Sequence, residues 1–342
     1  MTVTTRRLGS ADLHGTGSLA SRLPSDLASQ RSGAVVGVPD SFQPTGDGAW
    51  SLDDGSELYD VGFEFYVEHD DDVDVLVVWT ERDVEGLFAY SVALGWDQIQ
   101  GIGAQEVYDL YGWSDLGPAD AGSAGALQQI VLMNSPATYD MAAWGPQDIL
   151  THEVAHRWSA SLSLPSAQDR WVLTDAWYSH WNVHAHVGGP SAVGYGELLD
   201  LGGGSFEFVL SETLTYSDLE LYQQGLLAPE EVDELFYVED AHDYDPPTWG
   251  GAPWTNASYG AAVQYRGTRV EFTIDDVIAA HGPRLPPREE AQTSFRMAFV
   301  LVCQDPAACD EDTLRWVDEQ RAAWAETFSV ATRGRGTAAT EL

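Results

Sequence analysis

The stretch ILTHEVAHRW, residues 149–158, contains two histidines four positions apart, with a glutamate directly after the first. On an α-helix, residues i and i+4 lie on one face, so His152 and His156 can present ring nitrogens to the same metal ion. Glu153 points beside that ion, where its carboxylate can accept a proton from a bound water. The other residues up to His156 are uncharged, as expected for a helix buried behind its metal. The pattern predicts a hydrolytic zinc centre with Glu153 as catalytic base.

A catalytic zinc ion has three protein ligands and one open position, so a further ligand must come from downstream. We favour Glu220, because it lies on a short predicted helix after a loop. Glu220 also forms an S-x-x-E capping box with Ser217, in which it would bind only backbone N–H groups. His180 is either the third ligand, a donor that stabilises the oxyanion of the tetrahedral intermediate, or a histidine packed among aromatic residues. The other candidates are His184, His186, Glu197, Glu207, Glu212 and Asp218.

The elements around this motif change in character at Trp144. Before it, segments rich in β-branched and aromatic residues predict strands at 58–67, 73–80, 87–94 and 127–134. Gly145 and Pro146 then precede a helical pattern over 147–161, with proline suited to the first helical position.

The segments after this helix are predicted to be more helical. We expect helices at 175–186, 217–224, 275–281 and 311–328, a strand at 270–274, and a strand or buried helix at 295–303. The glycine-rich segment 188–204 and the polar segment 241–261 are predicted loops. Together the elements predict an α+β fold, in which an N-terminal mixed or antiparallel sheet packs on the HExxH helix and a mainly helical C-terminal half follows.

The domain organisation follows from composition along the chain. Residues 1–35 are rich in Ser, Gly, Thr and Ala without apolar periodicity, which predicts a flexible leader. Residues 36–342 form one predicted unit, with a sheet-rich part at 36–143 and the active-site helix and helical part at 144–342.

The charge of the chain limits its partners. The 342 residues include 54 acidic and 16 basic ones, all of the latter arginine, for a net charge of −38. Such a chain is repelled by nucleic acid and by anionic membranes. The sequence has no run of about 18 apolar residues, so it predicts no membrane span. The acidic runs at 68–74 and 243–245 lack the glycine and spacing of a calcium loop, and we interpret them as solvated charge.

The sequence says less about the compartment. The N-terminus lacks the apolar core of a secretory signal. Cys303 and Cys309 in CQDPAAC either close a small disulfide loop or are unrelated thiols. Pairing would favour an oxidising compartment.

Several segments together resemble a family of bacterial gluzincin-type zinc metalloprotease-like proteins. They are GSAGALQQIVLMN, HEVAHRW, an HW pair before a glycine-rich loop, YSDLELYQQGLLAPEEVDELFYVED, TIDDVIAAHGPR, VDEQRAAWAETF and ATRGRG. The resemblance covers residues 58–342. Family members are usually exported, which implies an extracellular or periplasmic location.

The resemblance implies a zincin-like fold and a zinc-dependent peptidase that acts on proteins or peptides. It also implies His152 and His156 as zinc ligands, Glu153 as catalytic base and Glu220 as third ligand. Two alternatives remain: an exported binding or surface module with a structural or non-catalytic zinc site, and a zinc hydrolase that acts on a non-peptide substrate. Only catalysis requires Glu153 and an open position on the zinc.

Overall fold

A computed structural model of the protein describes residues 34–39, 42–46, 48–52, 55, 57–95, 98–111, 117–140, 142, 144–175, 177–245 and 262–342. The α-helices are α2 (Glu57–Tyr66), α3 (Ala104–Tyr111), α4 (Pro146–Ala155), α5 (Asp218–Gln224), α6 (Ile274–His281) and α7 (Glu311–Ala331). Short 3-10 helices are η3 (Pro118–Ala121), η4 (Pro136–Tyr139) and η5 (Pro229–Glu231).

The strands fall into two main sheets and one short hairpin. The first sheet contains β1 (Ala34–Gly37), β12 (Ser294–Cys303), β4 (Val75–Thr80), β6 (Gln129–Asn134) and β5 (Tyr90–Ala93) in that spatial order, with β13 (Thr337–Ala339) paired to β12. The second contains β7 (Ala185–His186), β10 (Leu235–Asp245), β11 (Ala262–Phe272), β9 (Ser205–Leu210) and β8 (Gly196–Gly202). The strands β2 (Gln43–Pro44) and β3 (Trp50–Ser51) pair with each other.

The first sheet is mainly parallel and is covered on both faces. Every residue of β4 and β6 is buried, as expected for parallel strands between two layers of helices. Alternate side chains of β4 point to opposite faces: Val77 packs with residues of α4 and α7, and Val78 with residues of α2. Only β5, at one edge, runs antiparallel to its neighbour β6. This sheet is therefore the platform on which α4 lies.

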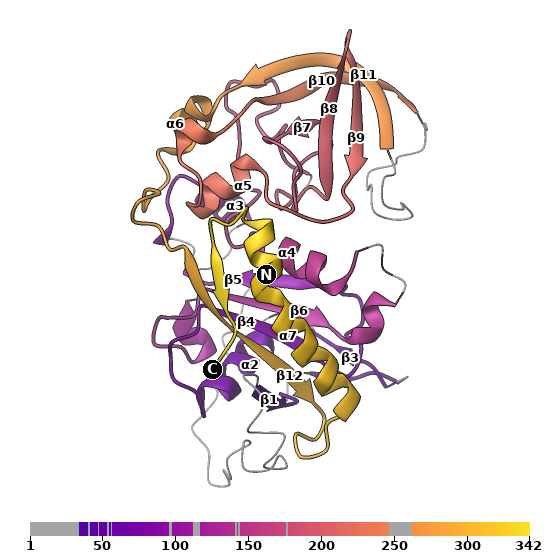
Figure 1. Ribbon diagram of the computed structural model, residues 1–342, viewed down its shortest axis with the longest axis vertical. Coiled ribbons are helices and arrows are strands. Elements are labelled where there is room, and N and C mark those ends of the chain that lie inside the picture. Colours follow the sequence, from indigo (N-terminus) through magenta and orange to yellow (C-terminus); the bar gives the residue numbers. More distant parts are fainter. Residues whose placement is uncertain are drawn as a thin grey trace.

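The second sheet is antiparallel and lies at the other end of the molecule, with α5 between it and the first sheet (Figure 1). Its strand β9 alternates half-buried and buried residues, the pattern of a strand with one face on the core. The prediction of a mainly helical C-terminal half is therefore wrong. The predicted loop 188–204 contains the strand β8, and the apolar alternation of SFEFVL at 205–210, which marks β9, was not recognised.

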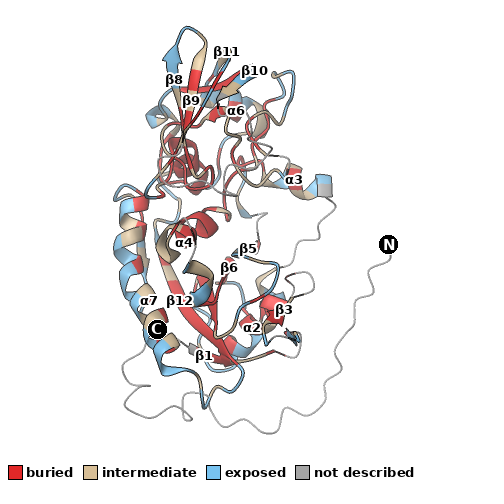
Figure 2. Ribbon diagram, turned by 90° about the vertical axis from the view of Figure 1, so that its right-hand side faces the viewer, coloured by how far each residue is buried: buried red, intermediate tan, exposed pale blue. Residues whose placement is uncertain are grey.

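Helix α2 replaces the strand predicted at 58–67. Its buried residues Leu58, Val61, Gly62 and Phe65 follow the helical spacing i, i+3, i+4, i+7, so they form one apolar stripe. Figure 2 shows α2 at the end of the molecule that holds the first sheet, and its apolar stripe packs with residues of that sheet. The β-branched and aromatic composition of this segment misled the prediction, whereas its periodicity is helical.

Other predictions met mixed outcomes. The segments 73–80, 87–94 and 127–134 contain β4, β5 and β6, and the tail contains α6, β12 and α7 as expected. The segment 175–186 is not a helix: apart from the short strand β7 it consists of turns and irregular chain. The predicted leader lies outside the described residues except for positions 34 and 35, which belong to β1.

The first sheet joins the two predicted parts of the chain. Strand β12 comes from the C-terminal part and lies between β1 and β4 of the N-terminal part. At its end Cys303 forms a disulfide with Cys309, which answers the question that the CQDPAAC loop raised. None of the described helices has the length and apolar character that crossing a membrane requires.

Candidate metal centre

Helix α4 begins as its sequence indicates. Gly145 is its N-cap residue and Pro146 takes the first helical position. The apolar residues Ile149, Leu150 and Val154 are buried in the core shared with the first sheet. From β6, the side chain of Gln129 donates a hydrogen bond to the backbone carbonyl of Glu153, with an N–O distance of 2.9 Å. The helix is thus fixed on the sheet at the turn that carries the motif.

Three histidines converge at the end of this helix. His152, His156 and His180 offer ligand atoms that all lie within 4.8 Å of one another, and we call this group the histidine centre. The Nε2 atoms of His152 and His156 are 3.0 Å apart. Two ligand nitrogens of a tetrahedral zinc ion lie about 3.3 Å apart, given Zn–N bonds of about 2.0–2.1 Å. The spacing of this pair is therefore close to that of two ligands of one ion.

The other ring nitrogen of each histidine is held by an acceptor. His152 Nδ1 donates to the carbonyl of Ala192 at 2.9 Å, and His180 Nδ1 to the carboxylate of Asp175 at 3.0 Å. His156 hydrogen-bonds to the backbone at Ser159. Because Nδ1 is engaged in this way, Nε2 is the nitrogen that His152 and His180 can offer to a metal ion. Such outer partners fix the tautomer and ring orientation of metal-binding histidines.

Burial keeps two of these histidines neutral. It lowers the pKa of His156 to about 3, with a further contribution from His180, and it lowers the pKa of His152 well below the ordinary value. Neutral imidazole is the form that binds metals, so protons compete weakly for these nitrogens near neutral pH. Burial also raises the pKa of the Glu153 carboxyl to about 8. That value suits a group that accepts and returns protons near neutral pH.

Glu220, our favoured third ligand, is not a member of the histidine centre. Its carboxylate accepts hydrogen bonds from Ser191 Oγ at 2.7 Å, from Val193 N at 2.8 Å and from Ser217 N at 2.7 Å. Ser217 and Glu220 form the capping box that the sequence offered as the alternative. The geometry favours the capping role for Glu220, and it places His180 where a third ligand would lie.

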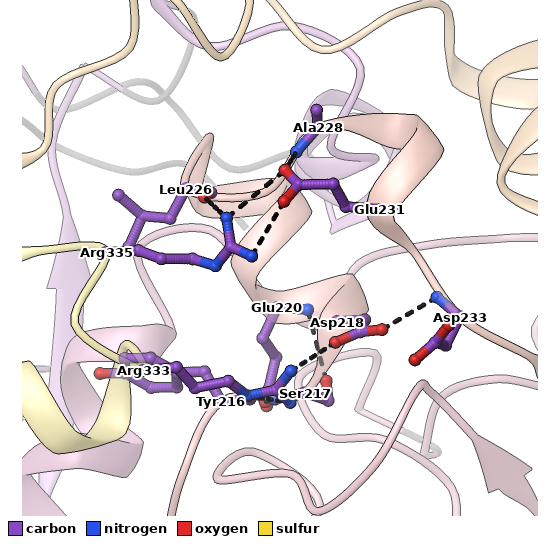
Figure 3. A network of polar contacts seen from close by, with 10 residues as sticks. All are labelled: Tyr216, Ser217, Asp218, Glu220, Leu226, Ala228, Glu231, Asp233, Arg333 and Arg335. Atoms are coloured by element: carbon purple, nitrogen blue, oxygen red, sulfur yellow. Dashed lines mark hydrogen bonds and ion pairs between the residues drawn. The ribbon is translucent and has the colours of Figure 1, made fainter.

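The remaining candidates lie elsewhere. Asp218 binds Arg333 at 2.6 Å in the network that joins α5 to the C-terminal segment (Figure 3). His184 contacts the Tyr244 hydroxyl at 2.9 Å, and His186 donates to the Leu198 carbonyl at 2.7 Å. Glu197, Glu207 and Glu212 are also outside the group of possible ligands found among the described residues.

Tyr195 is a residue that the sequence did not single out. Its hydroxyl lies 3.1 Å from His152 Nε2, and its ring stacks on the His152 ring at 4.3 Å between centroids. Burial raises the pKa of Tyr195, and the nearby charge of Glu153 raises it further. The phenol is thus protonated at neutral pH and close to both Glu153 and the histidines. The only sequence signal is a tyrosine between two glycines, which has no specific meaning by itself.

Comparison with known proteins assigns no family. No protein-family model matches the chain, and no curated protein or solved structure is significantly similar to it. The interpretation of the histidine centre therefore depends on its own geometry and chemistry.

Proposed function

We propose that the protein is a zinc-dependent metallopeptidase. The observation that carries this proposal is the convergence of His152, His156 and His180 at the turn of α4 that also carries the buried residue Glu153. Three imidazoles whose outer nitrogens are hydrogen-bonded form a donor set that suits zinc. A set of three protein ligands leaves one position for water or substrate, as catalytic zinc sites do. A zinc ion held there would polarise a substrate carbonyl and make a bound water acidic near neutral pH.

In this proposal, two side chains of the protein handle the protons of the reaction. Glu153 accepts the proton of the attacking water and passes it to the leaving amine, so its raised pKa matches the task. Tyr195 donates its hydroxyl proton in a hydrogen bond to the oxyanion of the tetrahedral intermediate. In this proposal Tyr195 takes the oxyanion role considered for His180, since His180 is engaged as a ligand.

The edge strand β5 supports a peptide as substrate. It pairs only with β6 among the described strands, so no described strand occupies its other edge, and it lies beside α4. An extended peptide can add to such an edge through backbone hydrogen bonds. This edge favours a peptidase over a zinc hydrolase for small non-peptide substrates. We further propose an extracellular or periplasmic location, which the disulfide between Cys303 and Cys309 supports.

Zinc analysis and digestion of casein or a peptide library test the proposal, with wild type compared with Glu153→Gln. We expect one zinc ion per chain in both proteins and a loss of cleavage of about 100- to 10,000-fold in the variant. Equal cleavage by both proteins would refute the role of Glu153. Stoichiometric zinc without cleavage in wild type would favour the exported binding module, and hydrolysis restricted to non-peptide amides or esters would favour the other alternative.

A further inference from the structure

The loop 191–196 carries two groups that touch the same histidine. The carbonyl of Ala192 accepts from His152 Nδ1, and the hydroxyl of Tyr195 lies beside His152 Nε2. The loop is closed on itself, because Ser191 N donates to the Gly196 carbonyl at 2.9 Å and Tyr195 N to the Ala192 carbonyl at 3.2 Å. The position of this loop therefore sets both the orientation of the His152 ring and the place of the phenol.

Glu220 holds this loop from behind. Beyond the bonds from Ser191 Oγ and Val193 N, its carboxylate accepts from Ala192 N at 3.3 Å. The carboxylate is fully buried, with 0% of the residue exposed. A helix cap needs only the bonds to Ser217, so the three bonds to residues 191–193 exceed what capping α5 requires. The carbonyl of Ala192 and the N–H of Val193 belong to one peptide group. Hydrogen bonds therefore connect Glu220 through this peptide group to His152.

We propose that Glu220 is a positioning residue of the metal centre: it fixes loop 191–196, so that Ala192 holds the tautomer of His152 and Tyr195 faces the ligand nitrogen. This inference rests on the proposed metal centre and deepens it. Charged acceptors bind N–H and O–H groups more strongly than neutral ones, which suits a carboxylate that must order several donors at once. Partners of this kind typically change metal affinity by about 10- to 100-fold.

Glu220→Gln tests this role, because the amide keeps the size of the side chain but replaces one acceptor oxygen with a donor. Asp218→Asn is the matched control. Asp218 is a second buried carboxylate in the first turn of α5, and its oxygens bind Arg333 and Asp233 N instead of loop 191–196 (Figure 3). Ser191→Ala is a milder variant, which removes one donor to Glu220 and leaves the carboxylate in place.

Competition with a chromophoric chelator measures the zinc affinity. Circular dichroism measures the melting temperature of the metal-free proteins. The visible spectrum of the Co²⁺ forms reports the number and type of metal ligands. We expect both carboxamide variants to melt earlier than wild type. Only Glu220→Gln should weaken zinc binding by about 10- to 100-fold, with a smaller loss in Ser191→Ala and a tetrahedral Co²⁺ spectrum throughout.

The outcomes separate this inference from the proposed function. A folded Glu220→Gln protein with wild-type zinc affinity, or an equal loss of affinity in Asp218→Asn, would leave Glu220 a purely structural residue and overturn the inference. A change in the number of Co²⁺ ligands in Glu220→Gln would make Glu220 itself a ligand and would also overturn it. Zinc affinities as expected, together with absent peptide cleavage, would support the inference and reject the peptidase. No zinc in wild type would reject both.

Discussion

Helices α4 and α5 each bury a glutamate beside the histidine centre, and the two carboxylates differ in their partners. The Glu220 carboxylate accepts hydrogen bonds from the Ser191 hydroxyl and from the backbone N–H groups of Val193 and Ser217. No hydrogen bond from a described residue reaches the Glu153 carboxylate, and burial alone shifts its pKa. A buried carboxylate with all its donors in place stabilises structure, whereas one without them is ready to exchange protons. The contrast supports the proposed catalytic role of Glu153 and a structural role for Glu220.

The largest expected effect is the loss of zinc affinity when His180 is replaced, and it tests whether His180 or Glu220 is the third ligand. His180→Ala should weaken zinc binding by about 1,000-fold, because it removes one of three ligand nitrogens, a larger change than the loss of an outer partner. His184→Ala, which changes a histidine of the same segment bound to Tyr244, should bind zinc as wild type does. Chelator competition measures both. Retention of tight zinc binding by His180→Ala would break the comparison and return Glu220 to the ligand set.

A second prediction concerns pH and the metal-free protein. Folding raises the pKa of Glu153 from 4.5 to about 8, so the folded state keeps a proton that the unfolded state releases between these values. The contribution of Glu153 to stability is therefore complete below pH 4.5 and is lost as the pH rises from there through 8, on the order of 5 kcal/mol in total.

Glu153→Gln removes this titration. In urea denaturation with chelator present, the variant should be more stable than wild type at pH 8, and the difference should vanish near pH 4.5. Glu220→Gln should instead be less stable than wild type at pH 8 by about 2 kcal/mol, because an amide hydrogen would face the donors around it. If both variants changed the free energy of unfolding at pH 8 in the same direction relative to wild type, the two glutamates would not differ as we infer.

The smallest effect concerns Tyr195, which lies near Glu153 and belongs to the loop that Glu220 binds. Tyr195→Phe should lower kcat by about 100-fold and change KM and zinc affinity little, because the hydroxyl acts on the oxyanion of the transition state. Tyr139→Phe is the control: Tyr139 also lies near Glu153, but its hydroxyl donates to the Met133 carbonyl. Steady-state kinetics on a cleaved peptide should leave Tyr139→Phe near wild type, and equal losses of kcat would remove the special role of Tyr195.

The parts of the fold that were predictable have local causes. Helix α5 lies between its capping serine Ser217 and the left-handed Gly225, as the sequence indicated. The mainly apolar and fully buried β4 and β6 were also recognisable as strands. Helix α2 was mistaken for a strand, because its β-branched and aromatic composition was given more weight than the helical spacing of its apolar residues. The second sheet was missed, because its strands pair across distant segments such as β7 with β10 and β9 with β11.

The sequence by itself determined the proximity of His152 and His156 and the place of Glu153 beside them, because one turn of helix sets these positions whatever surrounds it. Only the tertiary structure decided that His180 joins the pair, that Tyr195 faces it and that Glu220 supports it from behind. These residues lie on loops or at helix starts whose positions depend on packing between α4, α5 and the second sheet. Spacing along the chain carries no information about such distances, so the residues that complete the candidate site became recognisable only in the fold.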